Sequence, residues 1–414
     1  MKRIAVLIML SLLLSCKKEK EDVTGPNALI TIDSENEALF QGKRFYFVTT
    51  LDGELLGCKQ IQNNTISELY TDYANVPDKF NVHRLYLSDD NEIRYLESFF
   101  NTGQTYFTHE SVCEHILQIT GTCTIHVTGP TYSGYLISYP GGSRSGTNAI
   151  ENQPLNRTVE TFLYQEDNFL FTFLKKNQQY YYKYFFNLSP NETYSFELDT
   201  TTMDTNFEVN VLNAPEGMVF SGDNYIRSVI LGNLCYQSLC TLYSEINNDS
   251  TTLSIFDTPC GIEKYYKCRI NLRVEDDKDY SYEKNGNIPE FVPSLGFDIT
   301  VANLDYDNIS ITTQGSFDFI AGYYMGELNN AKSWKFHSDN PDLIEFPEIP
   351  AEIAEQYPGL TSSTFFATST VLGYIWLNEY SEIENYSDFM SELNLNSYLG
   401  ENSAVQKLTV KNYE

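Results

Sequence analysis

Short runs in which apolar and polar residues alternate recur along most of this chain, and turn-forming residues separate them. Alternation with period two puts one side of an extended segment in a core. Strands that follow one another at short spacing, with no helical period between them, favour antiparallel sheets. We therefore predict a mostly β protein of tandem antiparallel β-sandwich modules. The clearest strand segments are 44–50, 82–87, 124–127, 169–174, 180–186, 193–198, 297–301 and 404–410.

One β-hairpin is marked directly by its turn. The strand over 44–50 is followed by Asp52-Gly53 and then by a second apolar run over 54–56. Asp-Gly suits a two-residue turn because both residues tolerate positive φ angles. This strand–turn–strand opening resembles immunoglobulin-like (Ig-like) and carboxypeptidase-regulatory modules. The resemblance implies an Ig-like sandwich and no particular activity.

The C-terminal hundred residues have a different pattern, which predicts a few short helices. The segment 347–356 carries Pro350 where a first helical turn would begin. The segment 386–393 has Ser387 as a predicted N-cap, and Phe389, Met390 and Leu393 would share one face.

The N-terminus reads as an export signal. Lys2 and Arg3 precede an apolar run over 4–14, which ends at Ser15 and Cys16. The run has the length of a secretory h-region and is shorter than the ~20 residues that a membrane-spanning helix needs. Leu13-Leu14-Ser15-Cys16 resembles the lipobox of bacterial lipoproteins of the Bacteroidetes type. The resemblance implies cleavage before Cys16 and attachment of lipid to Cys16.

A charged segment follows the lipobox and predicts a solvated tether. It cannot bury apolar surface. Its Lys20-Glu21-Asp22 step resembles the signal that sends such lipoproteins to the cell surface. We expect an outer-membrane protein held by its lipid anchor alone, either displayed at the surface or facing the periplasm.

Composition shifts and turn-rich stretches suggest where the chain divides. We expect six segments: a signal peptide 1–15, a flexible tether 16–28, a β-sandwich module 29–130, a β module 131–212, a cysteine-containing β module 213–310, and a C-terminal β-rich module with short helices 311–414.

Charge and aromatic content narrow the classes of partner. The chain has 56 acidic against 27 basic residues and a formal net charge of −29. The electrostatic field of so negative a chain repels phosphate backbones, so we expect no nucleic-acid partner. The 31 Tyr and 26 Phe suit pleated sheet surfaces, and a Tyr-rich exposed face would be an alternative use as a sugar- or peptide-binding surface.

Eight cysteines are present, and four of them cluster. Cys16 is assigned to lipid. In an exported chain, clustered cysteines favour disulfides over zinc. We expect two bridges within one module, with three pairings open. The four are Cys235, Cys240, Cys260 and Cys268.

Histidine and cysteine interleave in one further window, His109, Cys113, His115, Cys123 and His126. If 113–129 is a hairpin with its turn at Gly121-Thr122, His115 and His126 are diagonal neighbours, and Cys113 and Cys123 lie on opposite faces. A helix over the first half of the window is the alternative. Neither arrangement gathers more than two ligands, so we predict no metal and no cofactor.

No sequence motif is specific enough to indicate a catalytic site. Gly141-Gly142-Ser143-Arg144-Ser145 approaches a nucleophile elbow but ends in Ser, and His337 is expected at a loop edge. We therefore expect a non-catalytic protein that binds a polymer, a peptide or a partner protein. The alternatives are a secreted glycosidase-like hydrolase with dispersed carboxylates and an accessory subunit of an outer-membrane machine.

Overall fold

A computed structural model gives the architecture. It describes residues 27–34, 42–63, 65–73, 75–89, 93–103, 105–108, 119–139, 142–147, 154–164, 168–221, 224–229, 239–241, 243–245, 250–257, 265–275, 277–326, 332–357, 360–361, 364–366, 371–381, 386, 388, 390 and 403–411.

One long, 13-stranded sheet organises the molecule. Its strands run in the order β18-β17-β21-β22-β28-β27-β25-β26-β6-β5-β2-β3, and β16 pairs with β21 beside this path. Neighbours are antiparallel except β6 and β26, which are parallel. The bounds are β2 Lys43–Thr49, β3 Leu55–Ile61, β5 Phe80–Leu87, β6 Arg94–Thr102, β16 Val219–Phe220, β17 Tyr225–Val229, β18 Leu239–Thr241, β21 Tyr265–Glu275, β22 Lys278–Gly286, β25 Phe319–Gly326, β26 Lys332–Ser338, β27 Val371–Tyr380 and β28 Ala404–Lys411.

Smaller sheets pack against the long sheet or form a separate sandwich. Their strand orders are β4-β1-β7, β10-β9-β12-β13, β11-β8-β14, β15-β20-β19 and β23-β24. The bounds are β1 Asn27–Asp33, β4 Ile66–Thr71, β7 Thr105–Thr108, β8 Ile119–Thr131, β9 Gly134–Tyr139, β10 Gly142–Thr147, β11 Pro154–Tyr164, β12 Phe169–Lys176, β13 Gln179–Phe186, β14 Thr193–Glu197, β15 Glu208–Asn213, β19 Tyr243–Glu245, β20 Thr252–Asp257, β23 Phe297–Asn303 and β24 Ser310–Gly315.

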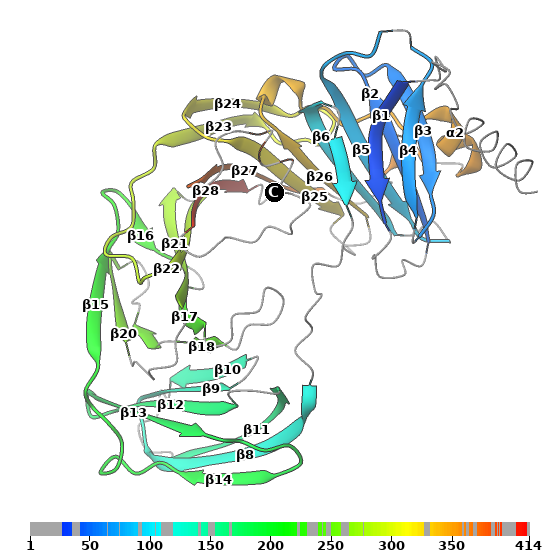
Figure 1. Ribbon diagram of the computed structural model, residues 1–414. Helices are drawn as coiled ribbons and strands as arrows, with labels where there is room; N and C mark the ends of the chain where they lie inside the picture. The colour runs from blue at the N-terminus through cyan, green and yellow to red at the C-terminus, as the bar shows by residue number, and fades with distance from the viewer. Residues whose placement is uncertain are drawn as a thin grey trace, which may run out of the picture.

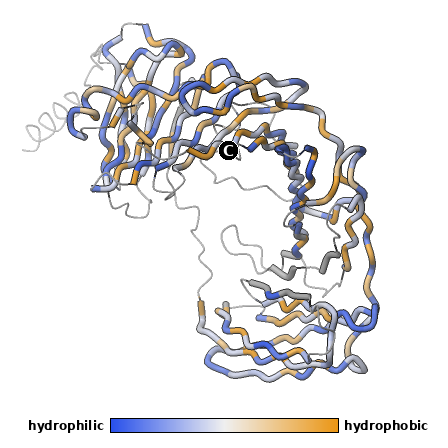
Figure 2. Tube along the Cα trace, turned by 180° about the vertical axis from the view of Figure 1, so that it is seen from behind, coloured by the Kyte–Doolittle hydropathy of each residue, from blue (hydrophilic) through white to orange (hydrophobic). Residues whose placement is uncertain are grey.

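The described strands follow a curved path through space (Figure 1), and the same curve is visible from behind (Figure 2). The sheet β4-β1-β7 covers one end of the long sheet, and its Leu29, Ile30 and Ile32 pack with Tyr46 and Val48 of β2. The sandwich of β8–β14 lies at the other end of the curve. The fold class agrees with the sequence prediction, because the protein is mostly β and holds several sandwich-like sheets.

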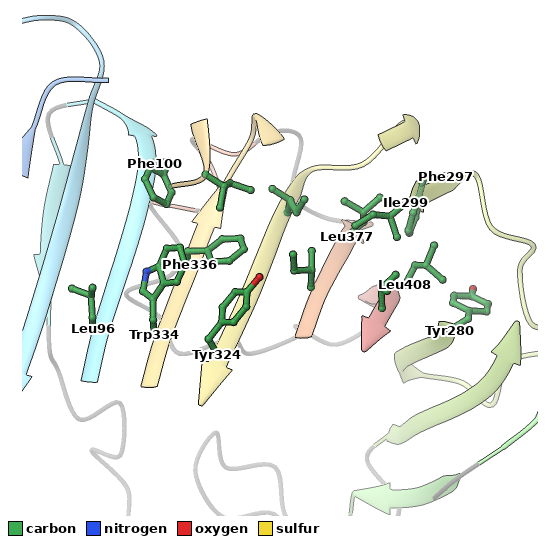
Figure 3. Packing of buried hydrophobic residues seen from close by; sticks show 14 of the residues in the cluster. Leu96, Phe100, Tyr280, Phe297, Ile299, Tyr324, Trp334, Phe336, Leu377 and Leu408 are labelled. Carbon is green, nitrogen blue, oxygen red and sulfur yellow. The ribbon is translucent and has the colours of Figure 1, made fainter. Parts of the chain in front are cut away.

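The largest core lies on one face of the long sheet. Figure 3 shows Leu96, Trp334, Tyr324, Leu377 and Leu408 projecting from consecutive strands of that face. The hairpin β23-β24 covers one part of this face, and the segment with η1 Pro341–Leu343 and α2 Ala351–Gln356 covers another. We call this side of the long sheet the core face, and the other side the second face.

The second sandwich has a core of its own. Cys123, Ile125 and Val127 of β8 pack between the two sheets with Ile137 of β9 and Leu170 of β12. The predicted segment 124–127 is therefore a strand, but it lies in this sandwich and not in the module 29–130. The order of segments along the chain does not show which sheet a strand joins.

The hairpin predicted at Asp52-Gly53 is confirmed, but its turn is not the predicted two-residue turn. Three residues lie between the paired Thr50 and Glu54, and of these three Gly53 alone has a positive φ. Gly53 has a φ of 88°, and the Thr50 N–H donates to the Glu54 carbonyl at 2.8 Å. Of the two arrangements considered for residues 109–126, the hairpin with its turn at Gly121-Thr122 is wrong, because β8 continues through both residues. A Cβ on Gly121 would lie 2.7 Å from the Pro190 Cβ, so this glycine allows a close approach and makes no turn.

Short helices near the C-terminus also agree with the prediction. Helix α2 starts directly after Pro350. Tyr386 and Met390 are helical and buried, four residues apart and therefore on one helix face. The predicted cap Ser387 and the residues Phe389 and Leu393 lie outside the described residues. In the part of the chain that the structure describes, no helix is long and apolar enough to cross a membrane.

Candidate functional site

A cavity of about 600 Å³ opens at one end of the strands β22, β27 and β28, on the core face. The segment 287–293, which leaves β22, forms its other wall. Aromatic, amide and charged side chains line it together, notably Tyr282, Lys284, Asn287, Glu290, Phe291, Glu379 and Gln406.

Strand register brings the central lining residues together. Tyr282 of β22 lies opposite Gln406 of β28, which lies opposite Glu379 of β27. Adjacent strands are ~4.8 Å apart, so the three side chains form one row across the sheet. Asn287, Glu290 and Phe291 come from the wall segment, whose Pro289 and Pro293 stop it from continuing as a strand.

Hydrogen bonds fix the polar part of that row. The Gln406 amide Nε2 donates to Glu379 Oε2 at 2.8 Å, and its Oε1 lies 3.0 Å from the Tyr280 hydroxyl, which donates. The amide is therefore held in one orientation. Burial, and secondly the Asp318 carboxylate, raise the pKa of Glu379.

The apolar part is open to solvent. Phe291 is 68 % exposed, although its ring is large and hydrophobic, whereas Tyr282 is buried. A cavity with aromatic surfaces and a few fixed polar groups is typical of small-ligand sites. This lining can pack against a flat apolar surface and hydrogen-bond its polar rim.

A second group of polar residues surrounds the buried carboxylate of Glu97 within the sheet. Glu97 of β6 contacts Arg84 of β5, and its Oε1 lies 3.2 Å from His337 Nε2 and 3.4 Å from Lys335 Nζ of β26. Burial alone would raise the pKa of Glu97, but Arg84, His337 and Lys335 hold it well below its usual value. A buried carboxylate surrounded in this way stabilises the joint between β6 and β26 and is closed to a substrate.

The other side of β6 carries a serine–histidine pair, also buried. Ser98 Oγ lies 2.9 Å from His83 Nδ1 and accepts a hydrogen bond from Trp334 Nε1 at 3.0 Å. Burial lowers the pKa of His83 to about 3, so the ring is neutral. Its Nδ1 then accepts from Ser98, and its Nε2–H faces Thr49 Oγ1 at 3.3 Å. Serine and histidine are the residue types of a nucleophile and its base. Both side chains are buried here, so a substrate cannot reach them.

His337 and Ser143 differ from their predicted settings. His337 is buried within β26 and does not lie at a loop edge. Ser143 lies in strand β10, paired with Ser138 of β9, and not at an elbow between a strand and a helix.

The clustered cysteines do not show the expected arrangement in the described part of the chain. Cys268 has a free thiol in the core, and burial raises its pKa to about 12. Strand β17 lies between Cys240 in β18 and Cys268 in β21, which sets their backbones roughly 10 Å apart, too far for a bridge. The expected pairing that includes Cys268 is therefore not formed. Cys235, Cys260 and the Cys240 side chain lie outside the described residues.

The remaining predicted site residues are only partly described. Cys123 is buried with a free thiol, and His126 Nδ1 lies 2.8 Å from Thr158 Oγ1 on the neighbouring strand. Cys16, His109, Cys113 and His115 lie outside the described residues. Among the described residues, no three His, Cys, Asp or Glu side chains are grouped so that they could hold a metal ion.

Sequence reasoning missed the cavity residues. The signal that could have found them is the segment 287–293, in which two prolines and an exposed Phe follow a strand directly. Glu379 and Gln406 had no such signal, because 27 residues separate them and only the pairing of β27 with β28 joins them.

Comparisons with known proteins give no family. No protein-family model matches the chain, and no curated protein is similar to it. Among solved structures, the N-terminal four Ig domains of Dscam1 isoform 6.9 align over 92% of this chain and 96% of that chain, with 8% identity and a TM-score of 0.13. The same domains of isoform 1.9 give the same identity, coverage and TM-score. Similarity at this level carries no argument about fold or function.

Proposed function

We propose that this chain is a lipid-anchored, non-catalytic binding protein of the bacterial outer membrane, and that the cavity beside Phe291 holds a short segment of a neutral surface polymer, an oligosaccharide. The observation that carries the proposal is the cavity lining, in which exposed Phe291 lies beside the fixed Gln406–Glu379 pair. A sugar ring has an apolar face that can pack on an aromatic ring and a hydroxyl rim that can pair with an amide and a carboxylate. The lipid anchor rests on Leu13-Leu14-Ser15-Cys16.

Binding of neutral oligosaccharides to the mature chain tests the cavity. A panel of immobilised neutral glycans identifies a binder, and calorimetry then compares Phe291→Ala with the unchanged protein. We expect the variant to bind about tenfold more weakly. Loss of the aromatic contact should cost ~1.4 kcal/mol, which corresponds to a tenfold change in the dissociation constant.

The matched control is Phe162→Ala. Phe162 is also exposed, but it lies in β11 of the second sandwich, away from the cavity. Equal affinity of the Phe291→Ala variant and the unchanged protein, or no binder in the panel, would contradict the proposal.

Glycoside hydrolysis is a second candidate, favoured by one observation. Glu290 and Glu379 line the same cavity, and the pKa of Glu379 is raised, as a general acid requires. Release of reducing ends from the bound glycan, abolished by Glu379→Gln with binding retained, would replace the binding function by this one.

A further inference from the structure

The second face of the long sheet carries a concentration of positive charge. Side chains alternate along each strand, so the residues that flank core positions in β17, β21, β26 and β28 point to this face. They include Lys335, Lys407, Arg269, Lys267 and Arg227. We call these five residues the cationic stripe.

Strand register lays the cationic stripe diagonally across the sheet. Lys335 of β26 lies opposite Tyr323 of β25, which lies opposite Tyr374 of β27. Six inter-strand steps separate β26 from β17, so the stripe covers about 29 Å across the strands. The cationic stripe could therefore contact a ligand at several positions along its length.

Aromatic rings lie between the cations. Tyr323, Tyr374 and Trp376 occupy the part of the face between Lys335 and Lys407, and the Lys407 ammonium sits 4.2 Å from the centre of the Trp376 ring. The face therefore alternates flat apolar surface with positive charge.

Positive charge exceeds negative charge on this face, in contrast to the whole chain. On the strands from β17 to β26, with Arg273 and Lys411 added, this face holds seven cationic side chains against the carboxylates of Asp279 and Glu283, while Glu97 on neighbouring β6 lies opposite Arg84. The chain overall has a net charge of −29. Burial and then the neighbouring cations Arg269, Lys335 and Lys411 lower the pKa of Lys407 to about 8, although Glu283 opposes them.

Two members of the cationic stripe are exposed enough to meet a ligand. The Arg269 side chain is 44 % exposed and that of Lys335 is 35 % exposed, even though each also contacts a carboxylate. An anionic ligand can therefore contact the exposed part of Arg269 or Lys335 while the ion pair of that residue with its carboxylate remains.

We propose that the cationic stripe binds an acidic polysaccharide, with the carboxylates of uronic acid residues on the lysines and arginines and the sugar faces on Tyr323, Tyr374 and Trp376. A nucleic acid would meet the same groups, but it carries one charge per ~1.7 Å when double-stranded, and the net charge of the chain repels so dense an anion more strongly. The sugar polymer has at most one charge per ring. This surface lies on the opposite side of the sheet from the cavity and is independent of it.

Oligogalacturonide binding to the full mature protein tests the inference. The fully methyl-esterified oligosaccharide is the matched neutral ligand. We expect binding of the acid form that weakens with salt and is absent for the ester, because charge-assisted contacts carry it.

Two variants assign the binding to the stripe. We expect Lys267→Gln with Lys335→Gln to weaken binding about tenfold or more, and Lys335→Gln alone to give a smaller loss if the double variant unfolds. Lys59→Gln, an exposed lysine of β3 outside the stripe, should bind as the unchanged protein does.

Three outcomes would overturn the inference: equal binding of acid and ester, equal loss in Lys59→Gln, or a single-stranded oligonucleotide that binds as tightly as the uronate. Phe291→Ala should leave this binding unchanged, which separates a failure here from a failure of the proposed cavity function.

Discussion

Two buried histidines give the protein a defined response to acid. Burial lowers the pKa of His83 to about 3 and, with a lesser contribution from Lys335, that of His337 to about 4. Both rings are neutral in the folded chain, whereas in the unfolded chain each takes up a proton below pH ~6.5. The unfolded state then holds more protons, so stability falls as the pH drops from ~6.5 towards 4.

We expect each histidine to remove roughly 2 kcal/mol of unfolding free energy between pH 7.5 and pH 5. Urea denaturation at the two values measures the change. His83→Gln should reduce the difference between them, whatever its own stability. A pH difference that His83→Gln does not alter would show that the ring is not neutral in the fold.

These residues also show why the buried network could not be predicted. His83, Glu97 and His337 lie on three strands, and 240 residues separate Glu97 from His337. Nothing in the local pattern around any of them marks a partner. His337 was expected at a loop edge, although the strand extends through Ser338.

At the scale of elements, one glycine sets how closely a ring packs on the long sheet. A Cβ on Gly322 of β25 would lie 2.3 Å from the ring of Phe336, which is fully buried on the neighbouring strand. We expect Gly322→Ala to lower the unfolding free energy by about 1–3 kcal/mol, because the ring must shift within a close-packed core. Chemical denaturation measures it.

Gly296→Ala is the control for that experiment. A Cβ there meets nothing within 4 Å, and its φ is not in the left-handed region. Its stability should differ from that of the unchanged protein by a few tenths of a kcal/mol. Equal effects of the two substitutions would mean that the Phe336 ring does not press on Gly322.

Individual strands were the most predictable elements. The runs over 44–50, 82–87, 169–174 and 297–301 became β2, β5, β12 and β23. Strands β2 and β12 are buried on both sides, whereas β23 shows the alternation that burial of one side produces. Partners were not predictable. The segment 124–127 alternates as clearly, yet only its contacts with β11 and β14 place it in the second sandwich.

At the scale of the whole molecule, the proposed anchor predicts a change of location. We expect Cys16→Ala to release the protein from membranes, because a lipid chain contributes ~0.8 kcal/mol per buried CH₂ and the variant cannot carry the lipid. Fractionation with labelled palmitate measures it. Ser15→Ala keeps a small residue before the cysteine and should stay anchored. Membrane retention of the Cys16→Ala variant without label would refute the lipid anchor.

The long sheet also predicts which parts depend on one another. A fragment 27–108 holds β6 without its neighbour β26, so we expect it to lack cooperative thermal unfolding. Among the described residues, the buried cluster between the two sheets of the second sandwich comes from residues 123–203, although Phe171 and Phe173 of one of these sheets also pack in a cluster with Phe256. A fragment 119–213 should therefore unfold cooperatively. Cooperative unfolding of 27–108 alone would show that the sandwich at this end needs no later strand.

The parallel pairing of β6 with β26 has a consequence for the order in which the chain acquires its structure. Lys335 is synthesised 238 positions after Glu97, so the two residues can pair only when most of the chain has been made. During synthesis from the N-terminus, one edge of β6, the strand that carries Leu96 and Phe99, therefore stays unpaired until β26 has been made. Contacts of such long sequence separation slow folding and prolong the exposure of unpaired strand edges, which are prone to aggregation. We expect slow refolding from denaturant, and a holding chaperone that shields this edge should raise the yield.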